Sequence, residues 1–261
     1  MLRARIIPCL LIHKGGLVKT TNFASPKYVG DPINAVKIFN EKEADELIVL
    51  DIDASVNCVE PNYSLIEKLA AECRMPICYG GGIKTPEQAS KIIDLGVEKI
   101  SISSAAILKP SLLSDISNAI GKQSVVAVLD VRKKKGLFQR GLEVSIHNGT
   151  QLVKIDLTIL AKTLQDAGAG EIVINSIDRD GLMQGYDLEL AQIMRENLNV
   201  PLTMLGGAGC LQDIEELIKC CGIIGAAAGS LFVFKGKYRA VLISYPTSTQ
   251  KDAIHFSSNI L

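Results

Sequence analysis

The sequence has no excess of charge of either sign. Its 261 residues include 28 basic and 28 acidic side chains, which give a formal net charge of zero. Without a net positive field, the chain offers no general attraction to nucleic acid or to an anionic membrane surface. We therefore expect neither nucleic acid nor membrane among its partners.

Long apolar runs, paired cysteine motifs and metal-ligand spacings are also missing. No apolar run reaches about 18 residues, the length that a membrane-spanning helix needs. The seven cysteines are odd in number and include no C-x-x-C pair. Together with the absence of a signal-peptide pattern, this predicts reduced thiols in a cytoplasmic protein. The three histidines are scattered, so we expect no metal site, and no cofactor is indicated.

What the sequence does have is a regular alternation of strand-like and helix-like segments. Short apolar runs predict buried strands at residues 5–11, 47–52, 76–80, 98–103, 124–130, 171–176, 201–205 and 223–228. Amphipathic segments predict helices at about 32–43, 63–73, 85–95, 110–120, 156–168, 187–197 and 210–220. Eight strands alternating with helices are typical of a (β/α)8 TIM barrel, and a doubly wound open sheet is the competing fold.

An internal repeat favours the barrel over the open sheet. Residues 44–53 resemble residues 169–178, and the segment Pro76–Ile83 resembles Pro201–Gly209. A repeat that spans half of the predicted strands is expected when two similar half-barrels form one ring.

We predict one barrel domain over residues 1–261, made of half-barrels at about 1–122 and 123–235, with an atypical C-terminal segment, 236–261. In this register the first strand is equivalent to the fifth. Leu11 then occupies the position that Asp130 occupies in the second half.

Two glycine-rich turns follow predicted strands three and seven, at Gly80–Gly82 and Gly206–Gly207. Small hydroxyl-bearing turns follow strands four and eight, at Ser103–Ser104 and Gly229–Ser230. Glycine lets backbone N–H groups approach an anion closely. Since sites in such barrels lie at the C-terminal ends of the strands, we expect two phosphate sites at one mouth and a ligand with a phosphate-like group at each end.

Carboxylates at the ends of other strands are candidates for the chemistry. Asp130 is the strongest candidate because it ends a strand that is otherwise apolar, whereas Asp51 and Asp180 also fit the plainer role of turn caps. The glycine-containing stretch 14–23 is either a lid that brings Lys19 to the ligand or an ordinary mobile loop.

Four charged residues stand at the starts of predicted strands one, two, four and six: Arg5, Glu46, Lys99 and Glu171. Pointing inward, they would form a ring of alternating sign at the bottom of the barrel. A solvated rim is the plainer interpretation.

Over roughly residues 1–235 the chain resembles the HisF-type cyclase subunit of imidazole glycerol phosphate synthase. The stretches that carry the resemblance are Arg5–Leu10, Leu17–Lys19, Asn22–Phe23, Gly30–Pro32, Ala44–Leu47, Gly80–Ile83, Ser101–Ala106, Gly168–Glu171, Ser176–Gly181, Gly185–Asp187 and Gly206–Gly209. In that family a glutaminase docks at the bottom of the barrel, and ammonia passes through a charged gate. At the top, two aspartates act as general acid and base.

The resemblance implies a role for most of the candidate residues. The gate would be Arg5, Glu46, Lys99 and Glu171. The phosphate sites would be Gly81, Gly82, Ser103, Ser104, Gly181, Gly207, Gly229 and Ser230. The other ligand contacts would be Lys19, Asp51, Asn175 and Asp180, with Asp130 as a catalytic residue and a phosphorylated small molecule as the ligand.

The departures from the family pattern lie close to the chemistry. Leu11 stands where the first catalytic aspartate is expected, and Ser103, Asn175 and Leu205 also differ from the residues expected there. A leucine transfers no proton, and loss of one acid/base group commonly costs roughly 10²–10⁴ in rate. Residues 236–246 also lack the charged amphipathic helix that usually ends the barrel.

These features, with the segments Ile7–Leu11 and Phe232–Pro246, resemble a side branch of cyclase-like proteins found with bacterial surface-polysaccharide genes. That likeness implies a barrel that conducts ammonia from a HisH-like glutaminase to a sugar amidotransferase, for lipopolysaccharide or O-antigen, without normal cyclase activity. One alternative is the cyclase subunit of imidazole glycerol phosphate synthase in histidine biosynthesis. Another is a non-catalytic regulatory barrel that binds a sugar phosphate.

Overall fold

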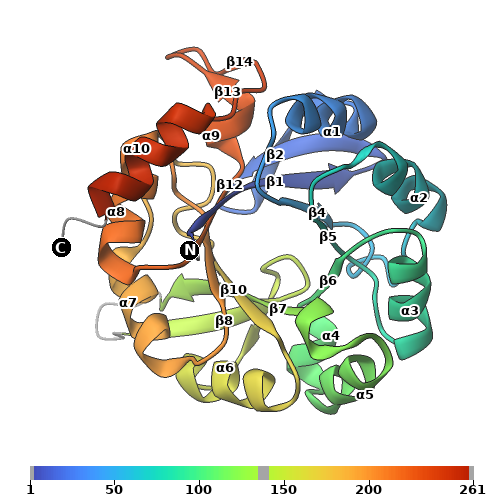
Figure 1. The fold of residues 1–261 in the computed structure, drawn as a ribbon. Coiled ribbons are helices and arrows are strands. Elements are labelled where there is room, and N and C mark those ends of the chain that lie inside the picture. Colours follow the sequence, from blue (N-terminus) through green and yellow to red (C-terminus); the bar gives the residue numbers. More distant parts are fainter. Residues whose placement is uncertain (1–2, 135–140, 259–261) are drawn as a thin grey trace.

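The computed structural model describes residues 3–134 and 141–258 and contains a closed ring of eight parallel strands (Figure 1). The last strand of the ring pairs with the first, so neither has a free edge. In ring order the strands are β1 (Arg5–His13), β4 (Leu47–Asp51), β5 (Ile77–Gly80), β6 (Lys99–Ile102), β7 (Val125–Lys133), β10 (Glu171–Ser176), β11 (Leu202–Leu205) and β12 (Gly225–Ala228). The predicted (β/α)8 barrel is confirmed, and the open sheet is excluded.

Helices surround the ring and follow its strands. They are α1 (Pro32–Glu41), α2 (Tyr63–Glu72), α3 (Pro86–Asp94), α4 (Ser104–Leu108), α5 (Ser111–Ile120), the 3-10 turn η1 (Lys122–Ser124), α6 (Leu157–Asp166), α7 (Leu188–Asn197), α8 (Leu211–Cys221) and α9 (Ser230–Val233). The starts of several helices are fixed locally. The side chains of Asp31, Thr85 and Asp156, for example, accept hydrogen bonds from backbone N–H groups of the first turn.

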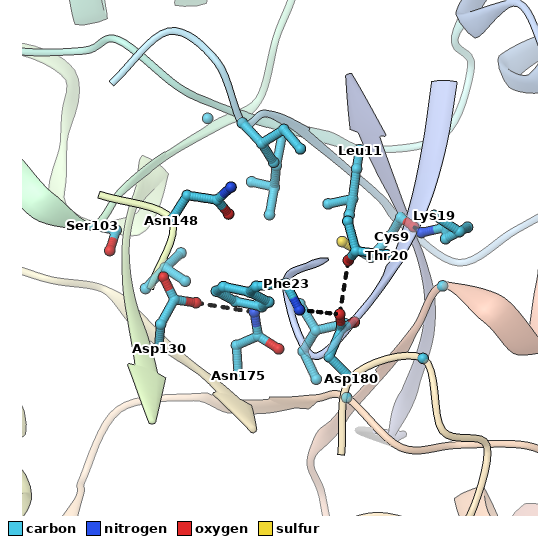
Figure 2. Close-up of a pocket in the computed structure, with 18 of the residues that line it drawn as sticks. Cys9, Leu11, Lys19, Thr20, Phe23, Ser103, Asp130, Asn148, Asn175 and Asp180 are labelled. Atoms are coloured by element: carbon cyan, nitrogen blue, oxygen red, sulfur yellow. Dashed lines mark hydrogen bonds between the residues drawn. The ribbon is translucent and has the colours of Figure 1, made fainter. Parts of the chain in front are cut away.

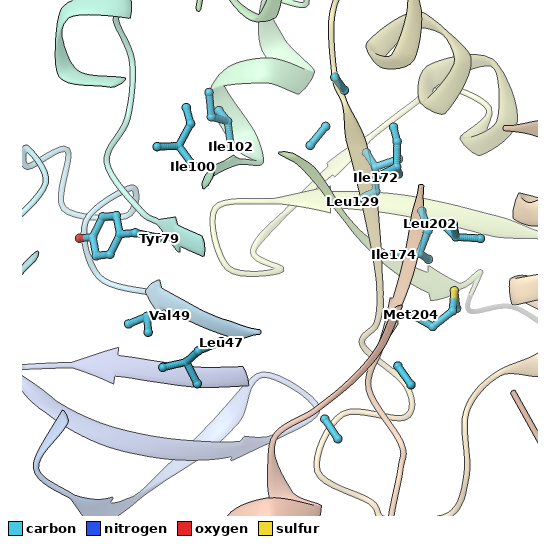
Figure 3. Close-up of a cluster of buried hydrophobic side chains, with 14 of the residues drawn as sticks. Leu47, Val49, Tyr79, Ile100, Ile102, Leu129, Ile172, Ile174, Leu202 and Met204 are labelled. Carbon is cyan, nitrogen blue, oxygen red and sulfur yellow. The ribbon is translucent and has the colours of Figure 1, made fainter. Parts of the chain in front are cut away.

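Side chains alternate between the two faces of each strand, so the ring has two apolar layers. Leu47, Val49, Ile172 and Ile174 belong to the large cluster between the strands and the helices (Figure 3). A smaller cluster fills the inside of the ring: Ile7, Cys9, Ile48, Cys78, Val126, Val128, Val173, Leu205 and Ala227. The barrel is therefore packed through its middle, which leaves its two ends for polar chemistry.

The stretch 14–23 is not the loop that we expected. Residues Gly16–Thr21 form β2, which pairs antiparallel with β1 and with β3 (Ala24–Gly30). Lys14 and Gly15 adopt left-handed backbone conformations, which suit a tight hairpin turn. In the second half of the chain, β8 (Leu142–Ile146) and β9 (Gln151–Val153) extend β7 in the same way. The division into two half-barrels stays a prediction.

The C-terminal segment lacks a helix at residues 236–246, as predicted, but contains a later helix that was not predicted. Residues 236–246 contain no helix, but a short hairpin of β13 (Phe234–Lys235) and β14 (Ala240–Val241) leads to α10 (Ser248–Ser258), which packs against α8. A helix that covers the barrel is therefore present after residue 246. Within the described part of the chain, no helix combines the length and the apolarity needed to cross a membrane.

Tyr245 ties the segment before α10 to the barrel. Its hydroxyl donates to the carbonyl oxygen of Ile6 at 2.7 Å and accepts from the backbone N–H of Asp45 at 3.0 Å. We predict that Tyr245→Phe lowers the free energy of unfolding by about 1–2 kcal/mol, because two partly buried backbone groups lose their partner. Urea denaturation would measure this. The exposed Tyr238 provides the control Tyr238→Phe, and equal stabilities of the two variants would contradict the prediction.

Candidate functional site

A cavity opens at the C-terminal ends of the barrel strands. The space between its walls that no atoms fill, with the open mouth included, is about 1060 Å³. Most of the predicted site residues line it: Leu11, Lys19, Asp51, Gly81, Ser103, Ser104, Asp130, Asn175, Asp180, Gly181, Gly207, Gly229 and Ser230. Gly82 instead lines an adjoining pocket, together with Gly81 and Ser104.

Asp130 is buried on the inner wall of this cavity. Asn175 is its partner on the neighbouring strand β10, and the Asn175 side-chain amide donates a hydrogen bond to the Asp130 carboxylate at 3.0 Å (Figure 2). Burial raises the pKa of Asp130 to about 7, against the lowering effect of the Asn175 hydrogen bond and with help from the negative charge of Asp180. The carboxyl can therefore both take up and release a proton near neutral pH.

Leu11 lies across the mouth from Asp130 (Figure 2). It pairs with Leu50 of β4 as Asp130 pairs with Asn175 of β10, and both leucines pack against the inner apolar cluster. At the level of Asp130, the mouth therefore has leucines on β1 and β4 and polar side chains on β7 and β10.

Asp180 fastens the turn between β2 and β3 at the mouth. Its carboxylate accepts a hydrogen bond from the Thr20 hydroxyl at 2.7 Å and one from the backbone N–H of Phe23 at 3.2 Å (Figure 2). Burial raises the pKa of Asp180, and these two hydrogen bonds act in the opposite direction. Through these contacts Asp180 holds the turn against the mouth.

Lys19 belongs to the same strand but is buried. Its ammonium group donates to the carbonyl oxygen of Cys9, and a side chain at Gly229 would collide with it. Burial lowers the pKa of Lys19, although the nearby Cys9 and Asp180 oppose the shift. Lys19 thus lies between β1 and the end of β12, and it lines the cavity.

The backbone at the two glycine-rich turns requires glycine, whether or not a phosphate binds there. Gly81 and Gly207 have φ angles of 120° and 108°, and a side chain at either would collide with a backbone carbonyl group. The hydroxyl of Ser104 accepts from the backbone N–H of His147 at 2.9 Å, whereas the buried Ser103 hydroxyl has no hydrogen-bond partner among the described residues. Phosphate binding at these turns stays a prediction.

The four charged residues at the strand starts do form a closed ring at the opposite end. Arg5 contacts Glu46, and its Nη2 lies 2.7 Å from Glu171. The ammonium nitrogen of Lys99 lies 2.8 Å from Glu46 and 2.9 Å from Glu171. Burial opposes the ionisation of Glu171, but the hydrogen bond and charge of Arg5 prevail and lower its pKa. The solvated rim is excluded, because both glutamates are buried.

Sequence reasoning did not identify Asn148 or Cys9 as lining residues. Asn148 lies in the turn between β8 and β9 with a left-handed backbone. The dipeptide Asn148-Gly149 is a common hairpin signal and could have revealed this turn. The described residues contain no group of three potential His, Cys, Asp or Glu metal ligands.

The raised pKa of Asp130 predicts how stability depends on pH. In the unfolded chain this carboxyl ionises near pH 4, whereas in the folded chain it does so near pH 7. The free energy of unfolding of the wild type therefore falls as pH rises between these values, because the folded state holds the Asp130 proton more tightly than the unfolded state does. We predict that Asp130→Asn is more stable than the wild type by about 1–3 kcal/mol at pH 8, with little difference below pH 4.

Urea unfolding across this pH range would measure the difference. Asp115→Asn, at an exposed position on α5, is the matched control and should show no such trend. A constant difference between the Asp130 variant and the wild type at all pH values would contradict the pKa assignment.

Comparison with known proteins agrees with this architecture. Residues 5–239 match the sequence model of the family described as "Histidine biosynthesis protein". A protein of Leptospira interrogans named "Putative imidazole glycerol phosphate synthase subunit HisF" is 56% identical over 98% of this chain and 100% of its own length. A Vibrio vulnificus protein named "Putative imidazole glycerol phosphate synthase subunit hisF3" is 55% identical over 96% of both chains.

More distant relatives carry the same subunit name. The imidazole glycerol phosphate synthase subunit HisF of Exiguobacterium sibiricum is 40% identical over 89% of this chain and 91% of its own length. The family match spans the whole ring of strands, and the Exiguobacterium sibiricum relative covers 89% of this chain. The chain therefore belongs to the histidine biosynthesis protein family, among its HisF-type members.

Proposed function

We propose that this protein is the barrel subunit of an imidazole glycerol phosphate synthase-type complex. In this role it receives ammonia from a HisH-type glutaminase and adds it to a doubly phosphorylated ligand at the mouth. The observation that carries the proposal is the pairing of a closed charged ring at one end of the barrel with a polar cavity at the other. The names of the relatives favour the same complex.

The charged ring suits the proposed entry of ammonia. Two buried glutamates hold Arg5 and Lys99 at the N-terminal opening, so the charges offset one another and the ring stays closed at rest. A neutral ammonia molecule passes a narrow opening of this kind more readily than an ion, because it sheds less hydration. A partner that docks on this end would control the opening by contacting the ring.

The mouth suits the proposed acceptor. The turns at Gly81 and Gly207 follow β5 and β11, and both glycines line the cavity. Glycine at such a turn allows the backbone N–H groups to approach an anion. A ligand with a phosphate at each end would place its middle beside Asp130. There the carboxyl would exchange protons, and Asn175 would hold it in place through the observed hydrogen bond.

Leu11 favours a second candidate function. Leu11 is apolar and lies opposite Asp130, so it cannot transfer a proton. A cyclisation that needs an acid/base group on each side of the ligand would then lack one of the two. The barrel would then deliver ammonia to another acceptor, such as a sugar bound by an amidotransferase, without cyclisation. The relatives' names support the histidine-pathway complex rather than this sugar route, so we place the sugar route second. A purely regulatory barrel would leave the charged ring without a use.

Reconstitution tests the first candidate. We predict that the purified barrel stimulates a HisH-type glutaminase when the doubly phosphorylated substrate of the histidine pathway is present. Imidazole glycerol phosphate should form, at a rate below that of a cyclase with both aspartates. Lys99→Met should weaken the stimulation, whereas Lys68→Met on the exposed face of α2 should not. Stimulation without product would favour the second candidate, and no stimulation would exclude both.

Restoring the missing carboxylate tests the role of Leu11. We predict that Leu11→Asp raises cyclase turnover by roughly 10²-fold, because it adds a proton-transfer group opposite Asp130. Leu11→Asn is the matched control, since it is similar in size to aspartate but carries no acid. If both variants gave the same turnover, the absence of a carboxylate at Leu11 would not be what limits the reaction.

A further inference from the structure

A histidine and an aspartate form a close pair beside the mouth. The Nδ1 atom of His13 lies 2.7 Å from one carboxylate oxygen of Asp53. The other oxygen of Asp53 accepts the backbone N–H of Lys14 at 2.7 Å. Both side chains are about one quarter exposed, His13 at 27% and Asp53 at 26%, so the pair reaches solvent and yet is held in place.

His13 ends β1 two residues after Leu11. Side chains of a strand alternate between its faces, so His13 lies on the same side of β1 as Leu11, one step closer to the mouth. Asp53 follows Asp51 and Ile52, which line the cavity. The charge of His13 acts on Asp51: burial raises the pKa of Asp51, and His13 is among the groups that lower it. The pair thus lies beside the cavity, next to Asp51 and Ile52, whereas His13 and Asp53 are not themselves among its lining residues.

The geometry of the pair favours one arrangement of the imidazole. When Nδ1 donates to Asp53, the Nε2 atom is left as a proton acceptor with a fixed direction. The charged and titratable groups that face the imidazole are Asp53 and Asp51 from the end of β4, with Lys14 next to it in the chain.

A turn cap alone does not account for the pair. Lys14 adopts a left-handed conformation, and a single carboxylate oxygen satisfies its N–H group. The second oxygen could remain in water at no cost, but it holds the imidazole instead. Asp53 therefore orients both the Lys14 N–H group and the His13 imidazole, although the turn needs only the first contact.

We propose that His13 is a second proton-transfer group of the mouth, oriented by Asp53, and that it serves the reaction on the side where Leu11 supplies no carboxylate. The inference rests on the proposed function, since it assigns an acid/base group to that reaction. His13 takes a proton from the ligand at Nε2 and returns it to water at the rim. The ligand's bond to that hydrogen breaks as the Nε2–H bond forms, and the Nε2–H bond then breaks as the proton passes to a water oxygen.

The test uses the reconstituted complex of barrel, glutaminase and doubly phosphorylated substrate. His13→Gln should lower kcat by roughly 10²-fold or more, with KM changed less than twofold. It should also remove one limb of the pH–rate profile. Asp53→Asn should lower kcat as well, because an amide that donates to Nδ1 reverses the tautomer. The control His255→Gln lies on α10, away from the mouth, and should match the wild type.

A second readout follows the imidazole itself. Nitrogen NMR of the free barrel should show His13 with its proton on Nδ1 in the wild type and on Nε2 in Asp53→Asn. The opposite tautomer in the wild type would overturn the proposal. So would a His13→Gln complex with the kcat and pH profile of the wild type, while the proposed function would survive that result. If the wild-type complex formed no product, both the proposed function and this inference would fall.

Discussion

The closure of the strand ring between β12 and β1 is the constraint on which the other features depend. Arg5 to Pro8 pair in parallel with Gly225 to Ala228, and this pairing leaves no strand edge in the ring. Once the ladder is closed, the register of each strand fixes the height of every inward side chain. Asp130 and Asn175 are therefore neighbours, as are Leu11 and Leu50, although each pair is far apart in the chain.

The closed ring also separates the two polar ends. Apolar side chains such as Ile7, Val126 and Val173 fill the middle, so charges are stable only at the openings, where partners or water reach them. At the N-terminal end, four charges satisfy one another. At the C-terminal end, burial raises the pKa of the Asp130 carboxyl to about 7, although the hydrogen bond from Asn175 acts in the opposite direction. A closed ring of charges at one end and a buried carboxyl with a raised pKa at the other are therefore consequences of the same packing.

Much of this was predictable from the sequence, because it depends on local pattern. Asp130 was recognisable as the polar end of an apolar strand, and the position of Glu171 at a strand start followed from the same periodicity. The antiparallel strand β2 was not predicted, because its pairing with β1 is set by the hairpin and not by alternation within Gly16–Thr21. The pairing of His13 with Asp53 was equally hidden, since it joins two strand ends that only the closed ring brings together. The same applies to α10, whose position depends on its contact with α8.

The most direct measurement is a crystal structure of the barrel with a substrate analogue that carries a phosphate at each end. We predict one phosphate at the Gly81–Ser104 side of the mouth, the other at the Gly207–Ser230 side, and the middle of the analogue beside Asp130. An analogue bound at one end only, with its second phosphate in solvent, would contradict a mouth built to hold a doubly phosphorylated acceptor.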